Sequence, residues 1–387
     1  MPKKTKSEKS SRKPVKRRAQ KKKSTVKKRV TTKKRAARGT RKTSETSGPI
    51  TLAEARSLIS PRKTNAPKRR RGAKKKAVGH PPGNEIAKAK RKRDKEVRSE
   101  RVQREKDFKK MMTLMKRRGV EGLPSEAPTA KRRRGRASSN APLQILAEGD
   151  SWFDYPVPFF GGGIIPRLED LVGLPILNLA KAGDEVRNML GVEERKVLTK
   201  QLTSGSPAGG KWDVLLFSGG GNDIVGEPMA LWIREFSRNV TPAKLINQAR
   251  FQSALDLVQA GYEDLILLRD SLSPDTHLIF HAYDFAIPDG RGICFMGPWM
   301  KPTFDVRNFK TRAPATAVVK EMLQQFAKML KKLERTHKNV TFIDTQGTLA
   351  ASTRSWHNEL HPSKSGFKKF AKLFHKQIKS KYPNRVL

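Results

Sequence analysis

Positive charge is concentrated in the first 140 residues, and this distribution limits where a folded core can form. Residues 1–140 hold 51 Lys and Arg against 11 Asp and Glu, and Phe108 is their one aromatic residue. Such a segment buries too little apolar surface to offset the entropy lost when a chain is ordered. We therefore predict a mostly disordered basic arm over residues 1–140 and one folded domain over residues 141–387.

Two segments inside the arm have helical patterns. Thr51 and Glu54 show capping-box spacing at the start of a short helix over 51–59. Residues 84–118 contain no Gly or Pro and mix acidic and basic side chains at helical spacing. Their apolar side chains are sparse before Phe108. We expect this second helix either to be solvated or to become ordered on a partner.

The charge of the arm predicts a polyanionic partner, either nucleic acid or another polyanion, bound through residues 1–140. Lys and Arg neutralise phosphates and release condensed counterions, which gives salt-sensitive affinity without sequence preference. Because aromatic residues are nearly absent, stacking on bases is not the expected mode. Basic runs at 67–76 and 131–136 also fit nuclear localisation signals in a eukaryotic host.

The sequence gives no sign of export or of membrane insertion. The basic N-terminus is not followed by the apolar run of a signal peptide, and no stretch of 18 apolar residues occurs. Cys294 is the one cysteine, so an internal disulfide is impossible and a reducing compartment fits. We expect an intracellular protein, cytoplasmic or nucleoid-associated, or nuclear in a eukaryote.

Apolar runs and helical patterns alternate through the second part of the chain. The helical patterns include 242–272, 317–337 and 363–382. Five apolar runs predict buried strands: 143–151, 175–180, 212–223, 276–284 and 340–345. Strands alternating with helices indicate an α/β fold, a three-layer sandwich with a central five-stranded parallel sheet.

Polar, glycine-flanked clusters follow the first three predicted strands, and a fourth cluster precedes the last helix. They are Gly149-Asp150-Ser151, Ala182-Gly183-Asp184, Gly219 to Asp223 and the segment 356–362. Ligands of such sheets bind at the carboxyl ends of the strands, where these clusters meet. Residues 282–304, with Trp299, form a long connection that we interpret as a wall or lid of the site.

These clusters resemble the four sequence blocks of the SGNH (GDSL-type) hydrolase family. The matching segments are "GDSWF", "NLAKAGDEV", "GGGND" and "ELHPSKSGF", in the order of the family. The resemblance extends from residue 143 to about residue 375 and includes none of the arm. It implies the flavodoxin-like SGNH hydrolase fold and hydrolysis of carboxylic esters.

The resemblance also assigns roles to residues of this chain. Ser151 would be the nucleophile, and His361 the base that removes its proton. The backbone N–H groups of Ser151 and Gly183 and the side-chain amide of Asn222 would form the oxyanion hole. We expect no cofactor. We expect no metal either, since His357 and His361 lack a third ligand.

One position departs from the family pattern, because Asn358 stands where the family has an Asp, three residues before the His. In the serine-protease triad, Asp→Asn costs about 10⁴ in rate. Glu359 could replace the acid if the segment is extended, as Pro362 favours. Alternatively, Asn358 orients the imidazole through its carbonyl oxygen, or neither residue does so. Glu359 is our preferred candidate.

Two functions remain open at this level. The first is a serine esterase that hydrolyses a carboxylic ester through an acyl-enzyme and binds a polyanion with its arm. The alternative is a nucleic-acid-binding protein with a catalytically weak or inactive SGNH-type fold, for which Asn358 is the strongest support.

Overall fold

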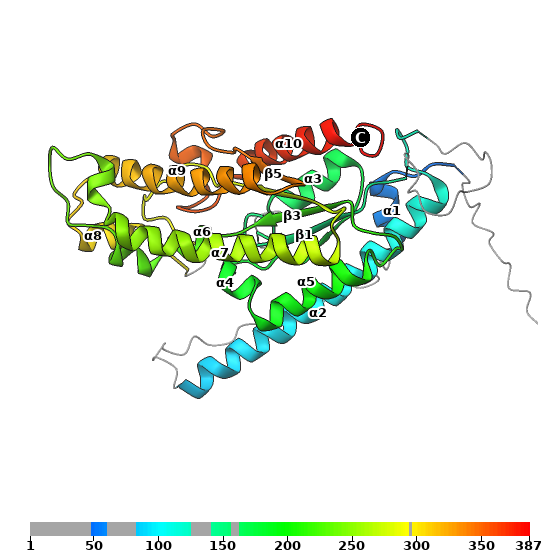
Figure 1. Cartoon of the computed structure of the whole chain (residues 1–387), viewed down its shortest axis with the longest axis horizontal. Helices are drawn as coiled ribbons and strands as arrows, with labels where there is room; N and C mark the ends of the chain where they lie inside the picture. Colours follow the sequence, from blue (N-terminus) through cyan, green and yellow to red (C-terminus); the bar gives the residue numbers. More distant parts are fainter. Residues whose placement is uncertain (1–47, 60–82, 125–140, 156–161, 294–295) are drawn as a thin grey trace, which may run out of the picture. The chain divides into compact units, whose positions relative to one another are not determined.

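The computed structural model describes residues 48–59, 83–124, 141–155, 162–293 and 296–387 (Figure 1). All of them belong to one compact unit, Ser47–Leu387. The basic runs at 67–76 and 131–136 lie outside the described residues. The predicted disorder of the arm therefore stays a prediction.

The five predicted strands form one parallel sheet with the order β2-β1-β3-β4-β5, which confirms the predicted fold class. The strands are β1 (Ile145–Gly149), β2 (Ile176–Asn178), β3 (Val214–Ser218), β4 (His277–His281) and β5 (Val340–Ile343). Every residue of β1, β3 and β4 is buried, because helices cover both faces. This double burial explains the apolar runs in the sequence.

The strand order places the site at one point of the sheet. From β1 the chain crosses to β2 on one side, then passes β1 again to add β3, β4 and β5 on the other. The order therefore reverses between β1 and β3, and a crevice opens beyond the carboxyl ends of these two strands. Ser151 follows β1 and Asn222 follows β3, so both lie at this crevice.

Helices flank the sheet on both sides (Figure 1). On one face α3 and α10 pack together, and α7 packs against α4, α5 and α9 on the other, as right-handed crossovers require. The main helices are α3 (Ile164–Val172), α5 (Val192–Ser204), α7 (Gln248–Leu272), α9 (Arg312–Thr336) and α10 (Lys364–Lys381). Short helices are α4 (Val186–Met189), α6 (Gly221–Ile224), α8 (Lys301–Val306), η1 (Glu227–Leu231), η2 (Pro242–Leu245) and η3 (Thr353–Ser355).

Both helices predicted within the arm are present, as α1 (Leu52–Ile59) and α2 (Gly83–Arg118). They pack on each other, and α2 also packs on the edge strand β2. The Phe108 ring lies 5.5 Å from that of Trp212, and Met112 and Met115 are completely buried. The apolar end of α2 therefore belongs to the hydrophobic core.

The folded unit begins earlier than the sequence predicted. We placed the boundary at residue 141, but the compact unit starts at Ser47. Helices α1 and α2 carry a few apolar side chains that the average composition of residues 1–140 does not reveal. These side chains are buried because the two helices pack together and α2 packs on the edge strand β2. A compositional average over 140 residues cannot detect such a contact.

Candidate active site

Residues from several strand ends line one pocket beyond the carboxyl edge of the sheet. Among them are Ser151 from the turn after β1, Asn222 from α6 after β3, and His361 from the segment before α10. Much of the remaining lining is apolar: Val225, Ala286, Val319, Leu323 and Leu360. The pocket therefore combines a cluster of polar groups with an apolar wall.

Ser151 and His361 are in hydrogen-bond contact, with 2.7 Å between Ser151 Oγ and His361 Nε2. Burial, and more weakly the charge of His357, lowers the pKa of His361 to about 3. The imidazole is therefore neutral near pH 7, and a neutral ring with its proton on Nδ1 accepts the hydroxyl hydrogen at Nε2. This is the contact that a serine nucleophile and its general base require.

Asn358 contacts the other nitrogen of the same ring, with 3.0 Å from its Oδ1 to His361 Nδ1. The same oxygen accepts the backbone N–H groups of Leu360 and His361, each at 2.9 Å. Its amide nitrogen donates to the hydroxyl of Tyr155 at 3.1 Å. These contacts fix the orientation of the amide, so the carbonyl oxygen faces Nδ1 and stabilises the tautomer with the proton there.

Glu359, our preferred orienting residue, does not contact His361. Its carboxylate accepts backbone N–H groups from Gly290, Trp299, Met300 and Lys301 at distances between 2.6 and 3.0 Å. The expectation depended on an extended segment, but the N–H of His357 donates to the carbonyl of His361 at 2.8 Å and closes a tight turn. In that turn, the residue three positions before His361 faces the ring.

The carboxylate of Glu359 instead anchors the connection between β4 and α8. Trp299 lies at the anchored end, and its ring is edge-on to that of His361 with centroids 6.0 Å apart. Part of the predicted wall is thus beside the imidazole. Phe304, the last residue of this connection, is buried against Phe309 instead, and Phe295 lies outside the described residues.

The three predicted oxyanion donors come from three segments. Within the described residues, the backbone N–H groups of Ser151 and Gly183 donate to no protein acceptor. Gly183 has φ 79°, in the left-handed region that favours glycine, and an added Cβ would meet open space. Asn222 Nδ2 donates to the carbonyl of Asp184 at 2.7 Å, which links the amide to the segment of Gly183. Gly183 itself does not line the pocket.

A second polar network, which the sequence did not reveal, lies directly beneath the Ser151 turn. Asp150 accepts hydrogen bonds from the hydroxyls of Ser218 and Tyr283 and from the backbone N–H of Trp152. His281 Nε2 lies 3.0 Å from Ser218 Oγ. This Ser, His and Asp combination resembles a catalytic triad in composition, but Ser218 and His281 are completely buried and no substrate reaches them.

Burial shifts both titratable ends of this network. It raises the pKa of Asp150 to about 6 and lowers that of His281 to about 4. The hydroxyl and N–H donors around Asp150 keep its carboxyl beside the sheet and thereby define the turn that carries Ser151. No local motif signals the network, because its members come from β1, β3 and β4 and meet only in the sheet.

The described residues show no sign of a metal centre or of a membrane helix. No group of three or more His, Cys, Asp or Glu side chains in the described ranges is placed to hold a metal ion. Within the same ranges, no helix is long and apolar enough to cross a membrane.

Comparisons with known proteins show similarity at the level of solved structures. A lipase from a goat rumen metagenome has 17% identity and a TM-score of 0.40, over 60% of this chain and 96% of its own. An extracellular lipase from Streptomyces rimosus has 15% identity and a TM-score of 0.40, over 60% and 99%. A protein assigned to the SGNH hydrolases from Slackia heliotrinireducens has 13% identity and a TM-score of 0.36, over 61% and 99%.

No family model matches this sequence, and no curated protein matches it. The functional interpretation below rests on the geometry of the site.

Proposed function

We propose that this protein is a serine esterase that uses Ser151, His361 and Asn358. The observation that carries the proposal is the continuous series of contacts from Ser151 Oγ to His361 Nε2, and from His361 Nδ1 to Asn358 Oδ1. Nucleophile, base and orienting group are each within hydrogen-bond distance of the next, as a hydroxyl nucleophile requires.

The reaction begins when Ser151 Oγ attacks the ester carbonyl carbon and its proton passes to His361 Nε2. The carbonyl electrons move onto oxygen, where the N–H groups of Ser151 and Gly183 and the amide of Asn222 would stabilise the negative charge. Collapse expels the alcohol, which takes the proton from His361. Water then attacks the acyl-enzyme with the same base, releasing the acid and restoring Ser151.

The pocket favours a substrate with an apolar acyl group. Its apolar wall, which includes Val225, Val319 and Leu323, lies in the same pocket as Ser151. Burial of hydrocarbon there gives binding energy of roughly 0.8 kcal/mol for each methylene. We therefore place the acyl chain in the pocket and expect short-chain aryl esters to serve as test substrates.

The test is hydrolysis of such an ester together with labelling by a fluorophosphonate. Wild type should hydrolyse the ester, Ser151→Ala should not, and peptide mass analysis should locate the adduct on Ser151. Ser218→Ala is a matched control, because this second serine also contacts a histidine. An adduct on Ser218, or equal rates for wild type and Ser151→Ala, would refute the assignment.

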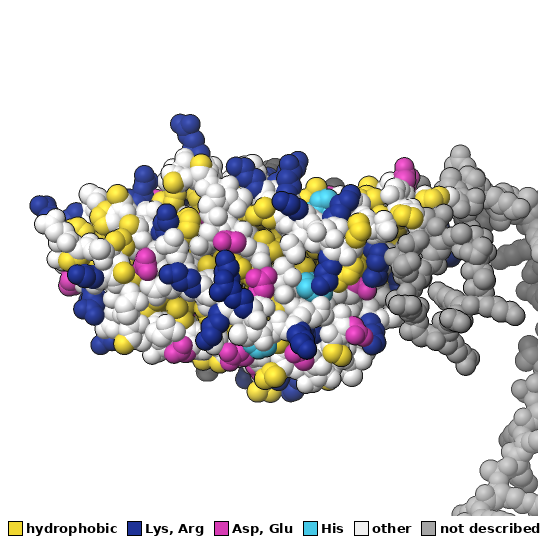
Figure 2. Space-filling model, turned by 45° about the horizontal axis from the view of Figure 1, so that its top comes forward, with side chains coloured by type: hydrophobic (Ala, Val, Ile, Leu, Met, Phe, Trp, Pro, Cys, Tyr) yellow, Lys and Arg dark blue, Asp and Glu magenta, His cyan; other side chains and the backbone are white. Residues whose placement is uncertain are grey.

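We also propose that the N-terminal region binds a polyanion, and the support for this is charge alone. Met1–Thr46 carries 21 Lys and Arg against two acidic residues. Figure 2 shows the basic side chains of the described unit spread over one face, with carboxylates among them. That face offers no concentrated basic patch, so the N-terminal region, together with the basic runs at 67–76 and 131–136, is the better candidate. Retention on DNA should fall steeply with salt.

A further inference from the structure

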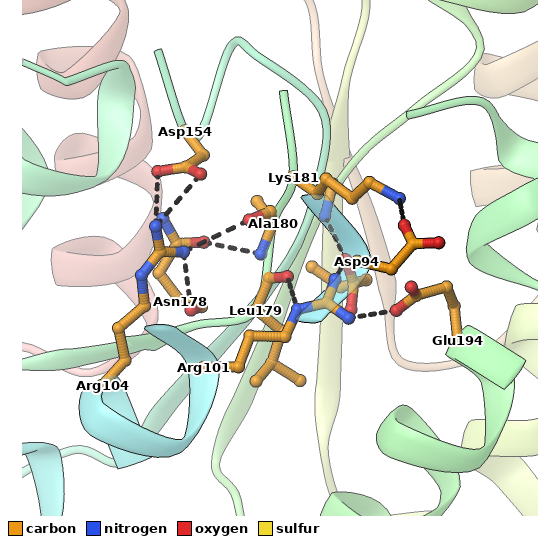
Figure 3. A network of polar contacts seen from close by, with 11 residues as sticks. Asp94, Arg101, Arg104, Asp154, Asn178, Leu179, Ala180, Lys181 and Glu194 are labelled. Carbon is orange, nitrogen blue, oxygen red and sulfur yellow. Dashed lines mark hydrogen bonds and ion pairs between the residues drawn. The ribbon is translucent and has the colours of Figure 1, made fainter. Parts of the chain in front are cut away.

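Helix α2 places two arginines against the segment that leads from β2 to Gly183 (Figure 3). Arg101 Nε donates to the carbonyl of Leu179 at 2.7 Å. Arg104 Nη1 lies 3.3 Å from the carbonyl oxygen of Asn178 and 3.2 Å from that of Ala180. Side chains from outside the catalytic sheet therefore hold three consecutive carbonyls just before Gly183.

The carbonyls of Asn178 and Ala180 need partners because β2 is an edge strand of the sheet, and Leu179 and Lys181 are the residues that bond to β1. The inner side of β2 pairs with β1, and no further strand of the described residues pairs with its outer side. An unpaired strand edge presents open backbone acceptors, which proteins satisfy with a covering element. In this fold the covering element is α2, which packs on β2.

Arg104 also reaches the turn that carries the nucleophile. Its Nη2 lies 2.9 and 3.1 Å from the two carboxylate oxygens of Asp154 (Figure 3). Asp154 is three residues after Ser151, and its backbone N–H donates to the carbonyl of Asp150 at 3.0 Å. One planar guanidinium therefore joins the nucleophile turn to the Gly183 segment, with several donors held in a rigid fork.

Neighbouring ion pairs secure the position of α2. Lys181 Nζ lies 3.8 Å from Asp94 of the helix. The side chain of Arg101 is 7% exposed, contacts Glu194 and lies 3.6 Å from the buried Glu148 of β1. Because an unpaired buried charge is costly, these partners specify one register of α2 along the strand end.

We propose that Arg104 is a positioning residue for the oxyanion hole, and that α2 is an intramolecular brace for the hydrolase site. This inference rests on the proposed esterase function. The N–H donors of Ser151 and Gly183 come from separate segments, and Arg104 contacts both segments. Oxyanion donors act only when they lie about 2.7–3.1 Å from the developing charge, and a misplacement of about 1 Å costs roughly 10² in rate.

The first test measures the brace without using activity. Hydrogen–deuterium exchange of the full chain should show faster exchange over 179–184, by about tenfold or more, in Arg104→Ala. Arg117→Ala is the matched control, since Arg117 is an exposed arginine of the same helix, away from β2 in the described contacts. Unchanged exchange in Arg104→Ala overturns the proposal.

The second test measures the consequence for catalysis. Arg104→Ala should lower kcat by about 10- to 100-fold with little change in KM and in the acid limb of the pH profile, because His361 keeps its contacts. Arg104→Lys should restore only part of kcat, since one ammonium can pair with Asp154 but cannot also span both carbonyls. An unchanged kcat in Arg104→Ala overturns the positioning role.

Two further measurements apply if Arg104→Ala does not fold or if the esterase function fails. If Arg104→Ala does not fold, Asp154→Asn releases the turn of the nucleophile while Arg104 keeps both carbonyls. It should give the same kinetic pattern, with faster exchange over 151–154; a pattern like that of Arg117→Ala overturns the proposal. If wild type hydrolyses no ester and takes no fluorophosphonate, the esterase function fails. In that case the exchange result still decides whether Arg104 braces the segment.

Discussion

Replacing Asn358 with Asp is the most direct test of how His361 is oriented and charged. Asn358 Oδ1 already accepts three N–H groups, those of Leu360, His361 and the His361 ring. A carboxylate in the same place still accepts these three N–H groups and adds a negative charge close to the imidazole. The tautomer should therefore stay as it is, while the imidazolium formed during catalysis gains a counter-charge.

The size of the effect follows from the contact distance. The ring nitrogen and the amide oxygen are 3.0 Å apart, so the charge centres would lie about 4 Å apart. With an effective dielectric of about 20, this attraction is about 4 kcal/mol, enough to raise the pKa of His361 by about three. Burial of the new carboxylate opposes part of this gain, so we treat it as an upper value.

The assay is the pH dependence of kcat/KM for a short-chain aryl ester. Only neutral His361 accepts a proton, so activity falls as the pH drops through its pKa, which is about 3 in wild type. In Asn358→Asp the acid limb should move upward, toward pH 6. Because the base then has a pKa nearer the working pH, kcat at pH 8 should rise. If half of the 4 kcal/mol lowers the activation free energy, kcat rises by about 30-fold.

Unfolding in acid must be separated from titration of the base. Samples returned to pH 7 after each assay should recover full activity, and Glu359→Gln serves as a matched control, because Glu359 is adjacent but does not contact the ring. The reasoning is refuted if the acid limb of Asn358→Asp stays where it is in wild type, or if Glu359→Gln moves it instead.

Three further predictions address the other parts of the structure. Asn222→Ala should lower kcat by roughly 10²–10³ with little change in KM, as steady-state kinetics would show; an unchanged kcat would remove it from the oxyanion hole. Glu359→Gln should lower the free energy of unfolding by about 1–3 kcal/mol, measured in urea, because four backbone donors lose a charged acceptor; equal stability would contradict the anchoring role. Deletion of Met1–Thr46, which removes 21 of the 51 Lys and Arg of residues 1–140, should weaken salt-dependent DNA retention and leave the thermal unfolding midpoint unchanged. Deletion of 1–140 should abolish retention and lower that midpoint, because it removes Phe108 from Trp212; DNA retention that survives the longer deletion would refute the proposed polyanion site.

Much of the fold was predictable because local patterns of apolar residues in the sequence indicate it. Strands β1, β3 and β4 are buried on both faces, and each of the five strands lies in an apolar run that ends in glycine or polar residues. The order of the four blocks also indicated which side chains meet, and Ser151, Asn222 and His361 do line one pocket. Parallel strands place their carboxyl ends on one edge, so this convergence follows from the topology.

The residue that contacts His361 Nδ1 was not predictable. Asn358 and Glu359 are adjacent in sequence, and the local backbone turn decides which of the two side chains faces the imidazole. The tight turn closed by His357 and His361 points Asn358 at the ring and leaves Glu359 for the backbone of the 290–301 connection. Turn geometry of this kind depends on contacts with a segment about 60 residues away. Sequence periodicity carries no information about it.

The sequence by itself determined the α/β class, the order of the strands along the chain and the polar residues at the edge of the sheet. Only the tertiary structure decided that α2 belongs to the folded unit, that Asn358 faces His361, and that Asp150 is held from beneath by Ser218 and Tyr283. The physical reason is the range of the interactions. The pattern of buried side chains repeats within a few residues. These contacts instead join side chains separated by up to about 130 residues, and the side chains take their directions only when the strands assemble into the sheet.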